Sequence, residues 1–258
     1  MQAELRRERI LEIARQNGGV DIEELHKAFD VSRMTVRRDL DRLAKSGFVT
    51  RTYGGAVIHE KQPLYELFEQ SFEAKMDQFV AEKKAIARYA VQFIADNDSI
   101  FLDGGTTTWH ITNQLSLKKN LTVITNSLSI AMALSKAAGL NLIMVGGTYR
   151  PLAAIFMGPL AEEALAQMHI DKLFVAVEGI TIDAGLTVPD MNEAHVKRAM
   201  VAAAREVIVV ADHSKFGVKT LSSFASIDSV HRIITDVGIA PEQAALFREN
   251  GVEVIVTE

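Results

Sequence analysis

Short apolar runs alternate with amphipathic helical patterns from residue 79 to the C-terminus, and this alternation constrains the fold more than any other feature of the sequence. The runs predicted to be strands are Ser99–Leu102, Leu121–Thr125, Asn141–Val145, Leu173–Val177, Val207–Ala211, His231–Thr235 and Val252–Val256. Helical patterns lie near 80–95, 127–138 and 192–205 and begin again at Pro241. Buried strands that alternate with helices form a parallel sheet with helices on both faces. The sequence therefore predicts a Rossmann-like, mostly parallel α/β domain.

The first sixty residues carry a different pattern, in which short helices replace the alternation. An apolar helical stripe in residues 3–16 ends at Gly18, because glycine tolerates the left-handed conformation that closes a helix. Asp21 is placed to cap a second helix near 21–29, and Ser32 to cap a third that runs to about residue 46. Residues 47–57 then predict a strand, a glycine-containing turn and a return strand. Together these elements predict a winged helix-turn-helix.

The outer face of the third helix and the wing are basic, which suits the major groove of DNA. That groove admits one helix, and an arginine can donate two hydrogen bonds to one guanine. The residues expected to contact DNA are Ser32, Arg33, Thr35, Arg37, Arg38, Arg42, Arg51 and Tyr53. On periodicity and charge alone, a protein-interaction module with merely solvated arginines remains the alternative.

The net charge of −5 does not by itself indicate a DNA-binding protein, so its distribution matters. Residues 1–60 contain eleven basic and ten acidic side chains, a net of +1, and residues 61–258 contain 17 basic and 23 acidic ones, a net of −6. Residues 31–58 contain six basic and two acidic side chains, a net charge of +4. The asymmetry is modest, and charge alone does not decide the function.

A glycine- and threonine-rich loop follows the first predicted strand of the larger domain. It consists of Asp103, Gly104, Gly105, Thr106, Thr107 and Thr108. Glycines let backbone amides approach a ligand, threonine hydroxyls can donate hydrogen bonds, and ligands of open α/β sheets bind at the carboxyl ends of strands. The loop is a candidate anion site; the alternative is a tight turn with threonine capping.

Further polar residues follow other predicted strands or begin a helix. They are Asn126, Gly147, Arg150, Glu178, Glu193, Lys197 and Lys215. At one sheet edge they would offer cations for a phosphate, and amides or carboxylates for sugar hydroxyls. With the loop, they form the predicted effector-binding set.

Two groups of motifs resemble the DeoR family of sugar-metabolism repressors. In the N-terminal part these are the run from Val31 to Leu40, with its Thr-Val-Arg-Arg-Asp-Leu core, and the Arg-Thr-Tyr-Gly-Gly-Ala wing at 51–56. In the larger part they are Asp-Gly-Gly-Thr-Thr-Thr, Thr-Asn-Ser-Leu, Val-Gly-Gly-Thr-Tyr-Arg, Val-Lys-Arg-Ala-Met and Ala-Asp-His-Ser-Lys-Phe-Gly. The resemblance covers nearly the whole chain. It implies a repressor that binds double-stranded operator DNA, and an effector domain similar to ribose-5-phosphate isomerase that binds a phosphorylated sugar.

An isomerase activity is not expected, because the acid–base constellation of that enzyme is incomplete. Its Asp-Gly-Ala-Asp-Glu run aligns with residues 178–182, where Thr181 and Ile182 replace two of the acids. Neither a catalytic relay nor a metal site is expected: Asp212, His213 and Ser214 are chain neighbours, and the seven histidines are scattered. A DNA-tethered isomerase is therefore a minor alternative, and no cofactor is expected beyond a small-molecule effector.

A redox-sensing repressor that binds a dinucleotide is the more serious rival. The loop after the first strand lacks the third glycine of the dinucleotide fingerprint. The next strand ends in Thr125 and Asn126, where an acidic residue would hold the ribose. Both departures disfavour this reading.

The predicted organisation is a DNA-binding domain at 1–58, a linker at 59–78 and an effector and oligomerisation domain at 79–258. A single winged helix offers few contacts, so a homodimer or homotetramer that binds two half-sites is expected. The chain has no cysteine, no visible secretory signal and no apolar segment near the roughly 20 residues that span a bilayer. A cytoplasmic protein without a membrane partner is therefore expected; the identity of the sugar phosphate does not follow from the sequence.

Overall fold

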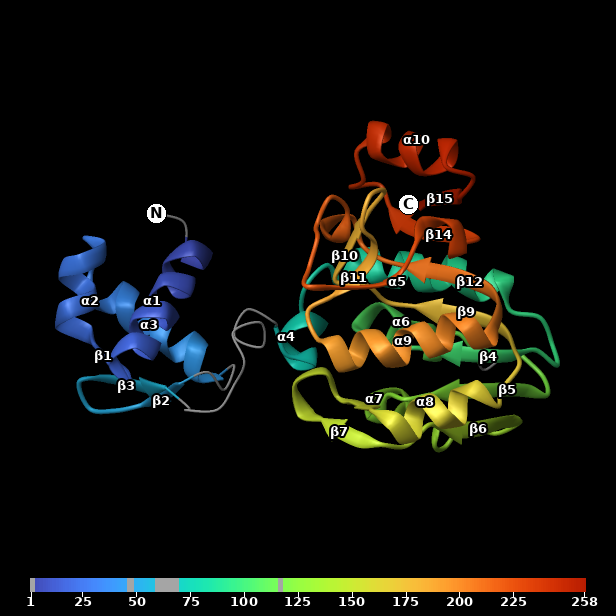
Figure 1. The fold of residues 1–258 in the computed structure, drawn as a ribbon, viewed down its shortest axis with the longest axis horizontal. Coiled ribbons are helices and arrows are strands. Elements are labelled where there is room, and N and C mark those ends of the chain that lie inside the picture. The colour runs from blue at the N-terminus through green and yellow to red at the C-terminus, as the bar shows by residue number, and fades with distance from the viewer. Residues whose placement is uncertain (1–2, 46–48, 59–69, 116–117) are drawn as a thin grey trace. The chain divides into compact units, whose positions relative to one another are not determined.

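The computed structural model describes residues 3–45, 49–58, 70–115 and 118–258 (Figure 1). The chain divides into two compact units, Met1–Ala74 and Lys75–Glu258, called here, after the roles that the sequence predicts for them, the DNA-binding unit and the sensor unit. The boundary between them falls inside the short helix α4 (Phe72–Met76).

Before α4, the described residues of the DNA-binding unit form the helices α1 (Ala3–Asn17), α2 (Ile22–Phe29) and α3 (Arg33–Lys45). Gly18 has a φ of +73° directly after α1, as the sequence predicts. Asp21 caps α2, because its carboxylate accepts hydrogen bonds from the amides of Glu23 and Glu24 at 2.7 and 3.3 Å. Ser32 precedes α3, and its hydroxyl accepts from the Thr35 amide at 3.1 Å. Both predicted caps are confirmed.

Val36, Leu40 and Leu43 turn one face of α3 into the core, and all three are at most 4% exposed. The wing is the predicted hairpin, β2 (Val49–Arg51) and β3 (Gly55–Ile58). A third strand that the sequence analysis missed, β1 (Gly19–Asp21), pairs antiparallel with β3. The signal for β1 is weak, because a strand of three residues shows no period and forms only by non-local pairing.

The sensor unit is built on one seven-stranded sheet in the order β15-β14-β12-β9-β4-β5-β6, with all neighbours parallel. The strands are β4 (Ser99–Leu102), β5 (Leu121–Thr125), β6 (Leu140–Met144), β9 (Ile170–Val175), β12 (Ala204–Val210), β14 (Arg232–Asp236) and β15 (Glu253–Thr257). The predicted parallel α/β fold is confirmed. The largest differences in bounds are at β9 and β12, each of which begins three residues earlier than predicted.

Helices cover both faces of this sheet and enclose two separate cores (Figure 1). The helices are α5 (Val80–Ala90), α6 (Thr106–Thr112), α7 (Leu128–Leu134), α8 (Pro159–Ala166), α9 (Met191–Ala203) and α10 (Pro241–Glu249). Apolar residues of α5, α6 and α7 pack in one core, and those of α8, α9 and α10 in the other. Alternate residues of a strand supply opposite cores: Ile100 and Leu102 face the first, and Phe101 the second.

Two small antiparallel elements were not predicted. The hairpin of β7 (Thr148–Arg150) and β8 (Ile155–Met157) is one, and the sheet of β10 (Gly179–Thr181), β11 (Gly185–Val188) and β13 (Ser222–Ala225) is the other. In the described part of the chain, no helix is long and apolar enough to span a bilayer.

Candidate functional site

The strand order places a topological switch point between β4 and β9. From β4 the chain builds outward through β5 and β6, and from β9 it builds in the opposite direction through β12, β14 and β15. The loops at the carboxyl ends of β4 and β9 therefore diverge to opposite faces of the sheet, and open α/β folds bind ligands at such a switch point. Asp103 directly follows β4, and Ala176 and Glu178 follow β9.

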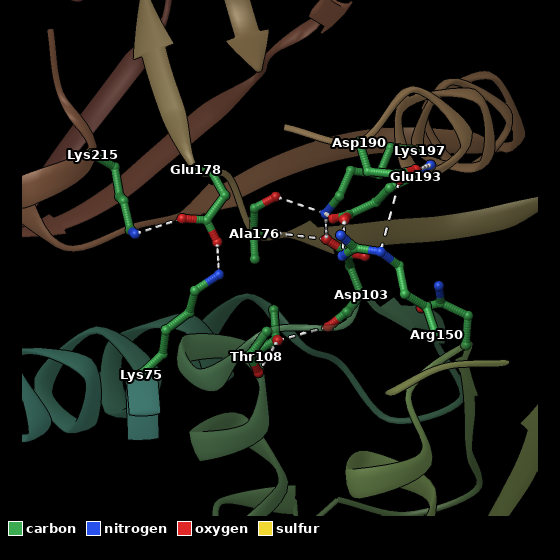
Figure 2. Close-up of polar contacts among 12 residues, drawn as sticks. Lys75, Asp103, Thr108, Arg150, Ala176, Glu178, Asp190, Glu193, Lys197 and Lys215 are labelled. Atoms are coloured by element: carbon green, nitrogen blue, oxygen red, sulfur yellow. Dashed lines mark hydrogen bonds and ion pairs between the residues drawn. The ribbon is translucent and has the colours of Figure 1, made fainter. Parts of the chain in front are cut away.

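A buried ion pair ties these loops to α9 (Figure 2). The Lys197 ammonium donates to the Asp103 carboxylate, and also to the Ala176 carbonyl at 3.0 Å. The same Asp103 oxygen accepts the Ala176 amide at 3.0 Å, and Glu193 lies 3.5 Å from the Lys197 ammonium. Lys197 is 2% exposed and Asp103 1%. Burial alone would lower the pKa of Lys197, but the Asp103 and Glu193 carboxylates outweigh it and raise that pKa, so the lysine is charged.

Arg150 extends this network from the end of β7. Its guanidinium lies 3.8 Å from the Asp190 carboxylate and 3.7 Å from that of Glu193. Asp190 also caps α9, accepting the Glu193 amide at 2.8 Å. Arg150, Glu193 and Lys197 thus converge at the start of α9, as the sequence analysis expected of residues at one sheet edge.

The glycines of the loop after β4 are required by close packing. A Cβ at Gly104 would lie 2.1 Å from the Ile155 side chain, and one at Gly105 would lie 2.6 Å from the Ala176 Cβ. Directly before β7, Gly147 has a φ of +143°, and a Cβ there would lie 2.5 Å from the Met157 carbonyl oxygen. The backbone path of both segments therefore depends on the absence of side chains.

The threonines of the same loop are buried, and Thr108 forms hydrogen bonds within the loop. Its hydroxyl donates to the carbonyls of Asp103 and Gly105 at 2.6 and 2.8 Å. Thr106 and Thr107 are each 6% exposed, so contact between these three threonines and an effector stays a prediction.

Asn126, after β5, presents a buried acceptor to the loop. Its amide nitrogen donates to the Phe156 carbonyl at 3.0 Å, while its Oδ1 has no hydrogen-bond partner among the described residues. That oxygen lies 3.8 Å from the position a Gly104 Cβ would occupy. An unsatisfied buried acceptor is costly, which makes it a suitable partner for a ligand hydroxyl.

Lysines gather around Glu178 on the other side of Ala176 (Figure 2). Lys75, from α4, donates to one Glu178 oxygen, and Lys215 donates to the other at 2.9 Å. Lys83, from the first turn of α5, is 3% exposed and donates to the Lys75 carbonyl at 2.6 Å. Lys75, Lys83, Lys215 and Glu178 are called here the lysine cluster.

The pKa values of this cluster show how strongly its charges interact. Burial favours the neutral acid of Glu178, but Lys75 and Lys215 outweigh it and lower the pKa to about 2. Burial, opposed by Asp212 and reinforced by Lys215, lowers the pKa of Lys83 to about 8. The three amino groups, set against the carboxylates of Glu178 and Asp212, leave one net positive charge when all five groups are ionised.

In the DNA-binding unit, two of the predicted arginines are already paired. Arg33 donates to both Glu23 carboxylate oxygens at 2.5 and 2.8 Å. Arg51 donates to the Gly55 carbonyl at 2.6 Å and lies 3.0 Å from the Asp41 carboxylate.

Most of the other residues predicted to contact DNA are exposed to solvent. The exposed residues are Arg37, Arg38, Arg42 and Tyr53. Ser32 is also exposed, and its hydroxyl is within hydrogen-bond distance, 2.9 Å, of the Thr35 hydroxyl. The exposed guanidinium groups on α3 are the strongest candidates for base contacts.

Comparison with known families agrees with both units. A family model described as the DeoR C-terminal sensor domain matches residues 78–237, and a DeoR-like helix-turn-helix domain matches residues 6–62. The chain belongs to the DeoR family. It is therefore a DNA-binding transcriptional regulator, and the family assignment supports the expectation that it is not an enzyme.

Similar DeoR-family proteins align along nearly their whole length. The regulator IolR of Bacillus subtilis is 38% identical, over 91% of this chain and 91% of its own. A putative aga operon repressor of Escherichia coli is 36% identical, over 97% and 93%. A ribose 5-phosphate isomerase from Plasmodium falciparum covers 52% of each chain at 17% identity with a TM-score of 0.39, a likeness too distant to carry an argument.

The structure of this DeoR-family regulator adds residues that the sequence analysis missed. Lys75 lies within the linker predicted at 59–78, and Lys83 lies in a predicted helix that carried no sign of a binding site. Asp190 is a helix cap at the head of α9, and a capping signal was available in the sequence. The two lysines carried no local signal, because only the fold brings them to Glu178.

Proposed function

We propose that this regulator is a repressor whose affinity for operator DNA is controlled by a phosphorylated sugar bound at the carboxyl edge of the sheet, between β4 and β9. The observation that carries the proposal is the lysine cluster beside the Asp103–Lys197 network at the switch point. A phosphate dianion there would gain charge-assisted hydrogen bonds from several ammonium groups.

The sugar hydroxyls would be bound on the other side of Ala176. Glu193 supplies carboxylate oxygens, Arg150 supplies donors, and the Asn126 Oδ1 supplies an acceptor. This division matches the two chemistries of a sugar phosphate, with cations for the phosphate and mixed donors and acceptors for the hydroxyls. The predicted contacts with Gly104, Gly105 and Gly147 would come from their backbone groups.

The DNA side of the proposal rests on α3 and the wing. Arg37, Arg38 and Arg42 would contact bases or phosphates, and Tyr53 the backbone of the duplex. We further propose the boundaries 1–58, 59–78 and 79–258 for the DNA-binding domain, linker and effector domain, and a homodimer or homotetramer that binds two half-sites.

A thermal unfolding screen tests the effector. Purified protein is heated with a panel of sugar phosphates, with the parent sugars and NAD(H) as controls. A ligand that binds only the folded state at about 100 times its dissociation constant adds about 2.7 kcal/mol, so a selective upward shift is expected with one phosphorylated sugar. A shift with NAD(H) and with no sugar phosphate would refute the proposal.

Matched lysine variants place the ligand. Lys215→Met should abolish the shift, because Lys215 belongs to the lysine cluster. Lys219→Met is the control, since Lys219 pairs with Asp183 at 3.3 Å and is 62% exposed. Equal ligand shifts in both variants would locate the phosphate elsewhere.

A further inference from the structure

Helix α4 connects the effector site to the chain segment that leads from the DNA-binding unit. Ala74 is the last residue of that unit and Lys75 the first of the sensor unit, and both lie in α4. Lys75 is held from two sides, by its ion pair with Glu178 and by the hydrogen bond from Lys83 to its carbonyl. The residue at the boundary is thus bound by groups of the proposed phosphate site.

Glu178 bridges α4 to a second element at the sheet edge. One of its oxygens accepts from Lys75 and the other from Lys215, in the short 3₁₀ helix His213–Lys215. The three side chains are 18–25% exposed, so they are partly accessible to an anion from solution. A phosphate drawn to the two ammonium groups would repel the carboxylate between them.

We propose that Glu178 is the internal competitor of the effector phosphate, and that its ion pair with Lys75 is the contact through which binding is transmitted to α4. In the unliganded protein Glu178 holds Lys75 and Lys215 together. When bound, the phosphate replaces Glu178 as the acceptor for both lysines, and α4 loses the contact that Lys75 makes with Glu178 in the loop after β9. This inference rests on the proposed function, because it assigns the phosphate to the lysine cluster.

The pair that Lys172 and Asp98 form provides a matched control. Their atoms are 2.5 Å apart and their side chains 18% and 15% exposed, similar to the Lys75–Glu178 pair. Asp98 precedes β4, whereas Glu178 follows β9, so the control pair lies at the amino-terminal edge of the same sheet. Asp98→Asn removes a comparable charge far from the proposed site.

The test compares Glu178→Gln, Lys75→Met and Asp98→Asn with the wild type, using a DNA duplex selected from random sequences by the wild-type protein. Without added sugar phosphate, Glu178→Gln should change the dissociation constant for this duplex by about fivefold or more. The change should be toward the value that the wild type has when it is saturated with the sugar phosphate found in the thermal unfolding screen. Glu178→Gln should also bind inorganic phosphate about two- to fivefold more tightly, because the competing carboxylate is gone. Hydrogen exchange of residues 70–78 should accelerate in Glu178→Gln and Lys75→Met, and stay unchanged in Asp98→Asn.

The outcomes separate this inference from the proposed function. If a sugar phosphate stabilises the wild type but Glu178→Gln matches Asp98→Asn in DNA affinity and exchange, the transmission role of Glu178 is refuted and the effector proposal stands. If no sugar phosphate stabilises the wild type, the effector proposal fails and the role of Glu178 as competitor of its phosphate fails with it, whereas a shift in DNA affinity in Glu178→Gln would still support transmission through the Lys75 contact. Fluorescence of Trp109, the single tryptophan of the chain, checks that the sensor unit of each variant is folded.

Discussion

Replacement of Lys197 by methionine should destabilise the sensor unit by about 3–5 kcal/mol, because it leaves the Asp103 carboxylate uncompensated in the interior. Both side chains are at most 2% exposed, so water cannot take the place of the lost ammonium without a rearrangement. Methionine retains an apolar chain of similar length, and lost packing therefore contributes little. The hydrogen bond from Lys197 to the Ala176 carbonyl is lost as well.

Urea unfolding followed by Trp109 fluorescence measures this loss. Trp109 lies in α6, and because the chain has no other tryptophan the signal reports on the sensor unit alone. Lys219→Met is the control: this pair is exposed, at 62% and 74%, and should cost less than about 1 kcal/mol.

The double variant Asp103→Asn with Lys197→Met tests whether the loss of stability comes from the uncompensated Asp103 carboxylate or from a nonspecific disruption of packing. Because both charges are removed together, it should be more stable than Lys197→Met alone. A loss below about 1 kcal/mol for Lys197→Met, or a double variant less stable than the single one, would refute the reasoning.

The glycine loop and the lysine cluster give three further expectations. Gly104→Ala should lower stability by about 1–3 kcal/mol in thermal unfolding, whereas Gly146→Ala, where an added Cβ meets nothing within 4 Å, should change it by less than about 0.5 kcal/mol. In the folded protein the pKa of Lys83 is lowered from 10.5 to about 8. Between pH 8 and 10.5 the unfolded chain therefore binds more protons than the folded one, and the free energy of unfolding should rise with pH. Lys83→Met should abolish that rise and stabilise the protein at pH 7. The pKa of Glu178 is lowered from 4.5 to about 2, so the stability that its ionised form contributes is complete above pH 4.5 and is lost as the pH falls to about 2. The difference in unfolding free energy between the wild type and Glu178→Gln should therefore vanish between pH 4.5 and about 2. A difference that stays constant over this range would contradict the lowered pKa.

Short-range patterns in the sequence were sufficient to predict the helix caps and the buried face of α3. The caps at Asp21 and Ser32 and the buried face of Val36, Leu40 and Leu43 follow from short-range rules, and the structure confirms them. The main sheet follows from alternation, because buried parallel strands are apolar on both faces.

The remaining elements depend on contacts that no local pattern specifies. The strand β1 forms by pairing with β3, more than thirty residues away in the chain. Lys75 and Glu178 are 103 residues apart, and their contact depends on the order of the strands. The sequence predicted Glu178 and Lys215 because each follows a predicted strand, and it missed Lys75 because a lysine in a polar segment resembles any solvated charge.

The pairing of Arg33 with Glu23 and of Arg51 with Asp41 has a consequence for how the protein finds its sites. Affinity for random DNA comes from neutralised phosphates and the counterions they release. Because Arg33 and Arg51 already have carboxylate partners, they displace fewer counterions from DNA than unpaired arginines would. We therefore expect the binding of this protein to non-operator DNA to depend less steeply on salt concentration than it would if Arg33 and Arg51 had no carboxylate partners.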